Sequence, residues 1–540
     1  MRKYIFIVGG VMSGVGKGIT CASIGKILQS CGFKVTAIKI DPYVNVDAGT
    51  MNPTEHGEVF VLDDGMECDQ DMGNYERFLN CSLSGKNYMT TGSIYQSVIS
   101  RERNLEYKGR CVEVVPHIPL EVINKIDKAA KHEKADIVII EVGGTVGEYQ
   151  NILFLEAVRM LTLQKPNDVL LTLVSFIPSQ GKEGELKTKP TQYAVRTVNS
   201  VGLQPDMIFA RAKTNLDNKR KEKIAFHCNV QKNSVISAPD VDSIYNIPVN
   251  YEKEGVSKII LKKLKLKPRS CNLRSWKKFV KDVGQAKNSV KIAIIGKYFS
   301  TGNYILSDSY ISVIEAVHHA AKKVGKRPEI TWLNSQEFEK NKNAFKKLSS
   351  FDGVIIPGGF GSRGIEGKIS VIKYLRKNKI PFLGLCYGMQ LAVIEYGRSV
   401  AKLRDANTTE INPKTPHPII DILPEQKEKL KKSDYGGTMR LGAYPAILKK
   451  NSIAGNAYDK LRISERHRHR YEVNPEYHKT LKNKGLIFSG LSPDKRLVEI
   501  IELPKKIHPF FVATQFHPEF LSRPLTPHPL FIEFIKNASK

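Results

Sequence analysis

Residues 381–394 read PFLGLCYGMQLAVI, and this stretch decides what kind of fold the second half of the chain adopts. The apolar run up to Leu385 predicts a buried strand, and the run that starts at Met389 predicts a helix. Glycines stand two residues before and two residues after Cys386, where a sharp strand-to-helix turn leaves little room for side chains. The pattern therefore predicts an α/β domain in which the Cys386 thiol projects from a turn at the N-terminus of a helix.

A histidine and a carboxylate that suit this cysteine follow in the segment QFHPE at residues 515–519. A thiol is a weak nucleophile until a base takes its proton, and a carboxylate can orient the imidazole that does so. A lone cysteine or histidine is usually a packing residue. Because packing explains neither glycine of the turn, we interpret Cys386, His517 and Glu519 as a candidate catalytic triad, which geometry must test.

The pattern along the chain predicts two α/β domains. Strand-like and helix-like segments alternate through the first half and begin again at Val290, which is typical of parallel sheets flanked by helices. We expect a first domain at 1–267, a linker at 268–289 and a second domain at 290–540, with a polar, lysine-rich surface insertion between about 400 and 440. Strands are expected at Tyr4–Val8, Lys34–Ile40, Asp136–Glu141, Val169–Phe176, Met207–Ala210, Val290–Gly296, Gly353–Pro357, Pro381–Leu385 and Phe510–Phe516.

Composition narrows the class of protein. The 540 residues carry a formal net charge of +29, yet the lysines are spread along the chain, so we expect no nucleic acid as a main partner. Such a positive field would attract small polyanions such as nucleotides. No apolar stretch approaches the ~20 residues of a membrane span, and the N-terminus lacks a signal-peptide pattern. Eight cysteines without a paired framework fit a reducing compartment, so we expect a cytoplasmic protein that binds no membrane.

The first expected strand ends in GGVMSGVGKG at residues 9–18. Backbone N–H groups of a glycine-rich turn before a helix converge on phosphate oxygens, and Lys17 would add a positive charge. The spacing departs from the regular P-loop, because the run from Gly10 to Gly16 is one residue too long and Gly18 replaces Ser or Thr. An ordinary strand–helix turn is the alternative for this motif alone.

Carboxylates follow further strands of the same domain. Asp71 lies in an acidic region after the second strand, and Glu141 ends the third. Carboxylates at the carboxyl ends of parallel strands, beside a phosphate loop, are the expected ligands of a nucleotide-bound Mg²⁺. A surface charge or a helix cap explains either residue in isolation. The loop KTKPTQ at 187–192 could hold a triphosphate and a base, or could be an ordinary solvated loop.

Together these motifs resemble the CTP synthase family over nearly the whole chain. The cysteine turn and the histidine segment belong to the resemblance, and the agreement runs in order through both domains. The other matching motifs are GGVMSGVGKG (9–18), KIDPY (39–43), HGEVF (56–60), EVGGTVG (141–147), KTKPTQ (187–192), PGGFG (357–361), GGTMRLG (436–442) and RHRHRYEVN (466–474).

The resemblance implies a synthetase domain of the P-loop, dethiobiotin-synthetase-like type, followed by a class I glutamine amidotransferase domain. ATP would phosphorylate O4 of UTP, and ammonia released from glutamine would displace the phosphate to give CTP, a step of de novo pyrimidine nucleotide synthesis. Mg²⁺ is the implied cofactor, GTP is a candidate allosteric activator, and CTP is both product and candidate inhibitor. The resemblance also implies a homotetramer and, as a candidate further assembly, filaments.

The resemblance carries site residues over position by position. The implied metal ligands are Asp71 and Glu141, and the implied catalytic residues are Cys386, His517 and Glu519. The implied glutamine contacts are Gly359, Tyr387, Gln390, Glu410 and Arg470. The implied ATP contacts are Ser13, Gly14, Val15, Gly16, Lys17, Gly18, Ile19, Lys39, Asp71, Asp240 and Val241. The implied UTP or CTP contacts are Ser13, Glu148, Tyr149, Gln150, Lys187, Thr188, Lys189, Pro190, Thr191, Gln192 and Lys223.

Three segments depart from the usual pattern of the family. Residues 148–151 read EYQN where the family has Asp-Ile-Glu-Ser, which puts the strength of CTP inhibition in question because Gln150 carries no charge. Residues 177–182, before Lys187, also differ. Tyr387 replaces the usual Leu, but the position acts through its backbone N–H, so we expect activity to survive. The loop around Arg363 and the lysine-rich insertion are candidate GTP contacts.

Two other functions compete with this interpretation. A cobyrinic acid diamide synthase shares the layout but does not require the motifs KTKPTQ or RHRHRY. A non-catalytic assembly or nucleic-acid-binding protein on the same scaffold would tolerate loss of Cys386, Lys17 or Asp71, and all three are present. RNA binding stronger than UTP binding would favour the second alternative.

Overall fold

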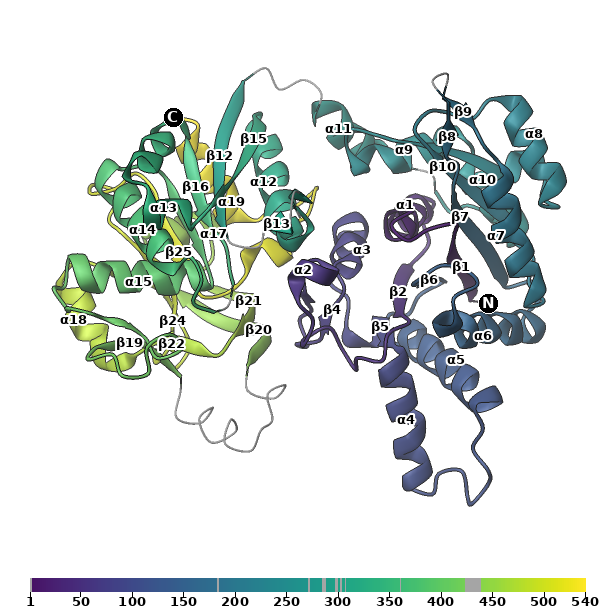
Figure 1. The fold of residues 1–540 in the computed structure, drawn as a ribbon, viewed down its shortest axis with the longest axis horizontal. Helices are drawn as coiled ribbons and strands as arrows, with labels where there is room; N and C mark the ends of the chain where they lie inside the picture. Colours follow the sequence, from purple (N-terminus) through teal and green to yellow (C-terminus); the bar gives the residue numbers. More distant parts are fainter. Residues whose placement is uncertain are drawn as a thin grey trace. The chain divides into compact units, whose positions relative to one another are not determined.

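The structure is a computed structural model that describes residues 2–181, 184–270, 272–283, 288–296, 300–301, 304–305, 307–359, 361–422 and 439–540. Internal contacts divide the chain into two compact units (Figure 1). Unit 1 comprises Met1–Ala48 and Asp71–Val280, and unit 2 comprises Gly49–Gln70 and Lys281–Lys540. The segment Gly49–Gln70 thus belongs with unit 2, although the boundaries expected from the sequence place it inside the first domain.

Unit 1 is built on a sheet of seven strands within the described residues, in the order β11-β10-β7-β1-β6-β2-β5. Each neighbouring pair of strands is parallel. Apolar runs that are buried on both faces are typical of such sheets, and every residue of β1 is buried. The strands are β1 (Lys3–Gly10), β2 (Val35–Asp41), β5 (Tyr88–Thr90), β6 (Ile137–Val142), β7 (Val169–Phe176), β10 (Met207–Ala212) and β11 (Val235–Pro239).

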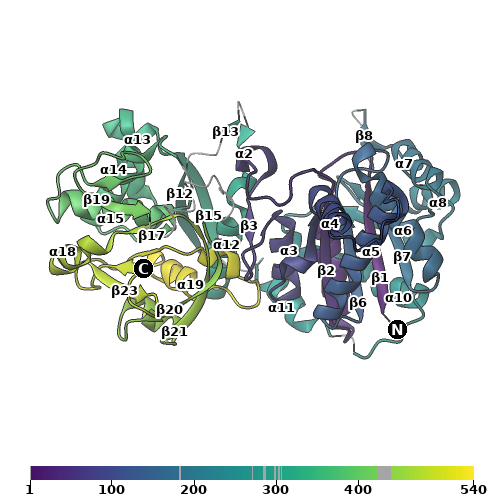
Figure 2. The ribbon, with the colours of Figure 1, turned by 90° about the horizontal axis from the view of Figure 1, so that it is seen from below.

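Helices cover both faces of this sheet (Figure 2). On one face, Tyr4, Phe6 and Val8 of β1 join a core with residues of α4 to α7. On the other face, a methyl group at Gly25 of α1 would lie 3.4 Å from Cδ1 of Ile139 in β6. The helices are α1 (Lys17–Ser30), α3 (Asp71–Leu79), α4 (Thr91–Arg103), α5 (Val114–His132), α6 (Ile152–Gln164), α7 (Lys189–Ser200), α8 (Asn218–His227), α9 (Ile247–Lys253), α10 (Val256–Lys263) and α11 (Arg274–Val283).

Unit 2 contains a sheet of nine strands in the part of the chain that is described, in the order β15-β12-β16-β17-β25-β24-β23-β20-β21. The pairs from β15 to β25 are parallel, and those from β25 to β21 are antiparallel. The strands are β12 (Ser289–Gly296), β15 (Arg327–Asn334), β16 (Gly353–Ile356), β17 (Phe382–Leu385), β20 (Arg440–Leu448), β21 (Arg462–His469), β23 (Ile487–Leu491), β24 (Val498–Glu502) and β25 (Phe511–Thr514).

Side chains that alternate along the strands of unit 2 enter two separate cores. Ala293 and Ile295 pack with α14 and α15 on one face, whereas Ile292 and Ile294 pack with α12 and α19 on the other. This three-layer arrangement confirms the α/β fold expected for both halves of the chain. The principal helices are α12 (Ile311–Val324), α14 (Ile365–Asn378), α15 (Tyr387–Ser399) and α19 (Pro529–Ala538).

Short elements complete unit 2. The segment Gly49–Gln70 forms α2 (Pro53–His56), β3 (Phe60–Val61) and β4 (Glu67–Cys68). Strands β18 (Asn407–Thr408) and β19 (Pro418–Ile422) lie in the expected insertion and form a small sheet with β22 (Tyr471–Val473). Residues 423–438 of the insertion lie outside the described residues. Further short helices within the described residues are α13 (Glu337–Lys340), α17 (Ile453–Tyr458) and α18 (His478–Asn483). Across the described ranges, no helix combines the length and apolar composition that crossing a membrane requires.

Helix α11 lies within the linker expected at 268–289 but packs on unit 1 through Trp276. This side chain is fully buried, and its indole Nε1 donates a hydrogen bond of 2.9 Å to the Tyr245 carbonyl. The rings of Phe78, Tyr245 and Phe279 surround it at centroid distances of 5.2, 5.8 and 5.9 Å. The ammonium of Lys26 lies 5.3 Å from the indole centroid. An aromatic anchor therefore attaches the start of the interdomain segment to unit 1.

We predict that Trp276→Ala lowers the free energy of unfolding of unit 1 by about 3–5 kcal/mol, because it removes a large buried ring and leaves a cavity. Urea denaturation followed by circular dichroism measures the change. The control is Phe226→Ala, since Phe226 is 84% exposed and its loss should change stability little. Equal denaturation midpoints for the Trp276→Ala variant and the wild-type protein would contradict the anchoring role.

Candidate functional site

The glycine-rich loop of unit 1 joins the end of β1 to α1. Its backbone takes the left-handed conformation at Val11, Gly14 and Gly16, with φ of 80°, 71° and 85°. The Lys17 ammonium donates a hydrogen bond of 2.8 Å to the Gly144 carbonyl in the loop after β6. Burial lowers the pKa of Lys17, although Glu141 counteracts the effect. The loop thus combines a helix N-terminus with a largely buried cation, which suits a phosphate group.

Lys39, at the end of β2, lies among the carboxylates predicted to hold a metal. Its Nζ is 2.6 Å from Oδ2 of Asp71 and 3.1 Å from Oε1 of Glu141. Asp41 is a third neighbour, with Oδ1 at 3.6 Å, and Tyr75 donates a hydrogen bond to Glu141. Burial and the charge of Asp71 raise the pKa of Glu141. Burial opposes ionisation of Asp71 as well, but Lys39 and Asn74 hold its pKa below the ordinary value.

This arrangement fits the cation that the sequence implies. No set of three or more His, Cys, Asp or Glu side chains in the described ranges forms a metal cage. Mg²⁺, however, is usually bound by one or two carboxylates together with substrate phosphates. Asp71 and Glu141 converge on one ammonium group beside the phosphate loop, so they offer two oxygen ligands and leave positions for a nucleotide. We therefore retain these two residues as the candidate ligands.

The predicted pyrimidine-nucleotide segment 187–192 lies at the start of α7, close to the glycine-rich loop. A methyl group at Gly10 would lie 2.7 Å from Cβ of Ala194, and Thr191 shares a hydrogen bond of 2.8 Å with Ser175 at the end of β7. Lys187 forms an ion pair of 2.5 Å with Glu185. The structure thus brings this segment to the carboxyl edge of the sheet that also carries the phosphate loop.

Six more of the predicted nucleotide contacts lie in segments that follow strands of the same sheet. Glu148 accepts hydrogen bonds from the backbone N–H of Thr145 at 3.0 Å and from the Gln150 amide at 2.7 Å. The neighbouring Tyr149 is 94% exposed. Asp240 pairs at 3.0 Å with Arg211, whose Nε would lie 3.7 Å from a methyl group at Gly16 of the phosphate loop. Val241 follows Asp240 after β11, and Lys223 lies in α8.

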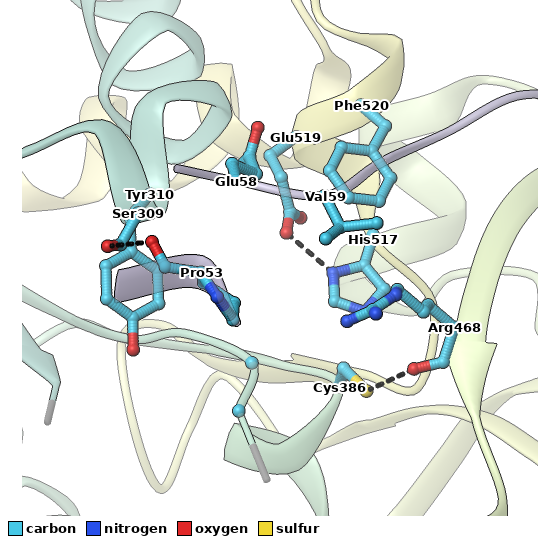
Figure 3. A pocket seen from close by; sticks show the side chains of 12 residues that line it. Pro53, Glu58, Val59, Ser309, Tyr310, Cys386, Arg468, His517, Glu519 and Phe520 are labelled. Carbon is cyan, nitrogen blue, oxygen red and sulfur yellow. Dashed lines mark hydrogen bonds and ion pairs between the residues drawn. The ribbon is translucent and has the colours of Figure 1, made fainter. Parts of the chain in front are cut away.

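In unit 2, Cys386, His517 and Glu519 come together (Figure 3). Nδ1 of His517 lies 2.7 Å from Oε1 of Glu519, and both side chains are buried. Burial disfavours the imidazolium, but Glu519 and Cys386 outweigh it and raise the pKa of His517 to about 10. A methyl group at Gly358 would lie 2.9 Å from Cε1 of His517 and 3.8 Å from Cβ of Cys386, so only glycine allows this close packing.

Backbone strain at Cys386 places its thiol at the end of β17. The residue has φ 49° and ψ −99°, a conformation that is uncommon for a side chain other than glycine. Its N–H donates a hydrogen bond of 2.7 Å to the Thr514 carbonyl. Gly388 lies so close to β16 that a methyl group on its Cα would be 2.2 Å from the Ile356 carbonyl oxygen. The expected strand-to-helix turn and its need for glycine are therefore present.

Cys386 lines two cavities of unit 2. The first contains all five residues predicted to bind glutamine, and its lining is Gly359, Cys386, Tyr387, Gln390, Glu410, His469, Arg470 and Tyr471. The second contains His517, Glu519, Arg468 and Phe520, together with Pro53, Glu58 and Val59 of the segment Gly49–Gln70. Cys386 and Gly359 therefore line both cavities.

Sequence reasoning missed the role of the segment Gly49–Gln70 in this site. Glu58 accepts hydrogen bonds of 3.2 Å from the backbone N–H of Ser312 at the start of α12. Arg466 pairs with Asp63 at 2.5 Å, and Arg468 pairs with Glu67 at 2.7 Å. The acidic residues of the segment and the alternate arginines of RHRHRY were both visible in the sequence, but their pairing was not.

Comparison with known proteins identifies the family of the chain. Residues 3–266 match the model of the CTP synthase N-terminus, and residues 305–537 match that of class I glutamine amidotransferases. A CTP synthase of Caldanaerobacter subterraneus is 49% identical over 99% of this chain and 98% of its own length. One of Methanocaldococcus jannaschii is 51% identical over 98% of this chain and 97% of its own length.

A solved structure, the glutaminase domain of Trypanosoma brucei CTPS with bound acivicin, is 37% identical. The match covers 46% of this chain and 94% of the solved chain, with a TM-score of 0.43. Agreement at about half of all positions, along the full length of curated relatives, is decisive for the family. The chain belongs to the CTP synthase family.

Proposed function

We propose that the two sites divide the conversion of UTP to CTP, the activity that follows from membership of the CTP synthase family. Unit 1 uses ATP to activate UTP, and unit 2 releases ammonia from glutamine. The position of Cys386 carries this proposal, because this residue lines both a cavity with the predicted glutamine contacts and a cavity with the His517–Glu519 pair. The glutamine chain and the released nitrogen then occupy different sides of the nucleophile.

In unit 2, the sulfur of Cys386 attacks the side-chain carbonyl of glutamine. A C–S bond forms and the C–N bond breaks, while His517 gives its proton to the leaving nitrogen, so that ammonia departs. Water then cleaves the thioester and releases glutamate. Backbone N–H groups at Gly359 and Tyr387 would stabilise the oxyanion, a contribution of about 2.7–4 kcal/mol per donor. Arg470 would bind the substrate carboxylate through paired hydrogen bonds.

The high pKa of His517 supports this sequence of proton transfers. With a pKa of about 10, the imidazole is protonated at neutral pH and is ready to act as the acid for the leaving group. Glu519 holds the ring through Nδ1, which leaves Nε2 for Cys386 and the substrate. Glutamine hydrolysis should therefore decline as pH rises through the pKa of His517, because the acid form of the imidazole is lost.

In unit 1, the loop 13–19 would hold the ATP phosphates through backbone N–H groups, and Lys17 would contribute its charge. Mg²⁺ held by Asp71 and Glu141 would neutralise charge on the transferring phosphoryl group. Lys39 lies between these carboxylates and would assist transfer to O4 of UTP. Ammonia then attacks C4, and phosphate leaves. Asp240 and Val241 would contact adenine, whereas residues 187–192, Lys223 and the segment 148–150 would contact UTP or CTP.

The finer properties that the resemblance implies also belong to this proposal. We expect a homotetramer in the cytoplasm, with GTP as an activator and filaments as a further assembly.

We predict that Cys386→Ala loses glutamine-dependent CTP formation but keeps synthesis from ammonium chloride. The substitution removes the nucleophile and leaves unit 1 unchanged. CTP formation with ATP, UTP and Mg²⁺, supplied with either nitrogen source, measures both activities. Cys111→Ala, at an exposed cysteine of unit 1, is the matched control and should keep both. Loss of the ammonia-dependent reaction in Cys386→Ala would contradict the division of labour.

We predict that Gly18→Ala lowers ammonia-dependent CTP synthesis by at least about tenfold, a loss of roughly 1.4 kcal/mol in transition-state stabilisation. The new methyl group would lie 1.9 Å from Oδ1 of Asp71, so the carboxylate must leave its place. Glutamine hydrolysis without nucleotides serves as the internal control, because unit 2 is untouched. A Gly18→Ala variant with normal synthesis and normal Mg²⁺ dependence would argue against Asp71 as a ligand.

We predict that CTP inhibits a Gln150→Glu variant more strongly than it inhibits the wild-type protein. The half-inhibiting CTP concentration should fall by about three- to tenfold. A hydrogen bond to a charged group contributes ~1.5–3 kcal/mol, and we expect a smaller gain here because position 150 is exposed. Inhibition curves at fixed UTP measure the change. Gln164→Glu, at an exposed position near the end of α6, is the control. Equal inhibition of the Gln150→Glu variant and the wild type would disprove the prediction.

A further inference from the structure

Gln515 is a fully buried residue beside the nucleophile, and the mechanism above does not use it. Strands β17 and β25 are parallel, and Leu385 pairs with Thr514. The next residues along the two strands are Cys386 and Gln515, so they lie side by side as the chain leaves the sheet. The backbone is held on both sides, because Gln515 N–H donates to the Glu499 carbonyl at 2.8 Å and Cys386 N–H donates to the Thr514 carbonyl at 2.7 Å.

The side-chain amide of Gln515 connects the cysteine to a residue of the glutamine cavity. Its Nε2 lies 3.7 Å from Sγ of Cys386. Its Oε1 lies 3.3 Å from Nε2 of Gln390, and that nitrogen also donates to the backbone carbonyl of Tyr471 at 2.9 Å. Gln515 and Gln390 are 0% and 2% exposed, so bulk water does not compete for these groups.

A backbone carbonyl sets the orientation of this chain of amides. The Tyr471 oxygen can only accept, so Gln390 must present its NH₂ group there. The same NH₂ group faces Gln515, which must therefore offer its oxygen to Gln390. The NH₂ group of Gln515 is then directed at the sulfur of Cys386. The hydrogen-bond network thus determines that the nitrogen of the Gln515 amide, and not its oxygen, faces the sulfur.

We propose that Gln515 is a catalytic residue of glutamine hydrolysis, whose side-chain Nε2–H donates a hydrogen bond to the Cys386 sulfur and stabilises and directs the thiolate. The amide proton stays on Gln515, and no bond of Gln515 is made or broken. This inference rests on the proposed role of Cys386 as the nucleophile, and it adds to the Cys386–His517–Glu519 set a group that acts on the sulfur itself.

The surroundings of the sulfur explain why such a donor is needed. The Arg468 carbonyl oxygen lies 3.8 Å from Sγ and can accept a hydrogen bond from the neutral thiol. When His517 holds the proton, the sulfur is an anion and the same carbonyl repels it. Gln515 supplies a donor in a buried site at that stage, and a donor already in place needs no reorganisation during the reaction.

The experiment compares Gln515→Met, which keeps the size but removes the donor, with Gln515→Glu, which replaces the donor by an acceptor. Gln336→Met, the same change at a residue of unit 2 outside both cavities, is the matched control. Glutaminase kcat/KM and ammonia-dependent synthesis are measured for each. The rate of alkylation by iodoacetamide is followed against pH at Cys386 by mass spectrometry of peptides, with the exposed Cys111 as an internal reference.

We expect Gln515→Met to lower kcat/KM for glutamine by about 10- to 100-fold, with ammonia-dependent synthesis retained. This is less than the roughly 100- to 1,000-fold cost of losing an oxyanion-hole donor, because the contact to sulfur is long, at 3.7 Å. The pH midpoint for alkylation of Cys386 should rise in Gln515→Met and rise further in Gln515→Glu, whereas that of Cys111 should not move. Glutaminase activity of Gln515→Glu should recover towards acidic pH, because the protonated carboxyl can donate in place of the amide. Gln336→Met should behave as wild type.

A Gln515→Met variant with kcat/KM within about twofold of wild type, and with an unchanged alkylation profile, would overturn the inference. Loss of ammonia-dependent synthesis in both Gln515 variants would overturn it too, in favour of a purely structural role. Failure of the proposed function gives a different result, because Cys386→Ala would then keep glutamine-dependent synthesis. Normal Gln515 variants beside an inactive Cys386→Ala refute this inference alone.

Discussion

The parallel pairing of β17 with β25 is the constraint on which the amidotransferase site depends. Because Leu385 is opposite Thr514, the residues that follow both strands leave the sheet at the same edge, and Cys386 meets the segment 515–519 there. The left-handed backbone at Cys386 then turns the thiol out of the sheet plane, and Gly358 leaves room for His517 to approach. A hydrogen bond of 2.7 Å from His517 to Glu519 completes an assembly that no single strand could build.

The segment Gly49–Gln70 belongs to unit 2, although the chain on both sides of it belongs to unit 1. The segment leaves unit 1 after β2, lines a cavity beside Cys386, and returns to unit 1 at Asp71, a candidate metal ligand. Its acidic residues pair with arginines of β21, whose Arg468 carbonyl accepts from the cysteine thiol. Residues adjacent in sequence to the candidate metal ligand thus line a cavity beside Cys386.

Sequence periodicity predicted most of the parallel strands, because they are short apolar runs buried on both faces. It missed the parallel strands β5, β11 and β15 and the antiparallel strands β20, β21, β23 and β24. Strand β21 shows why. The run RHRHR contains no apolar residue, yet Arg466 and His467 are fully buried, because Asp63 pairs with the arginine and Glu499 lies 3.5 Å from the histidine. A strand whose burial depends on charged partners distant in sequence has no local hydrophobic signal. The linker helix α11 is a similar case, since its one buried tryptophan finds its aromatic partners only in the fold.

The sequence alone determined the family, the α/β class of both halves and the residue types of each site, because glycine turns, carboxylates at strand ends and the cysteine and histidine motifs act through local backbone geometry and chemistry. The tertiary structure decided which of these residues meet. It placed the segment Gly49–Gln70 with the second unit, made Cys386 part of the lining of two cavities and directed the Gln515 amide at the sulfur. Those relations depend on strand register and on long-range ion pairs, and neither is encoded in any short stretch of the chain.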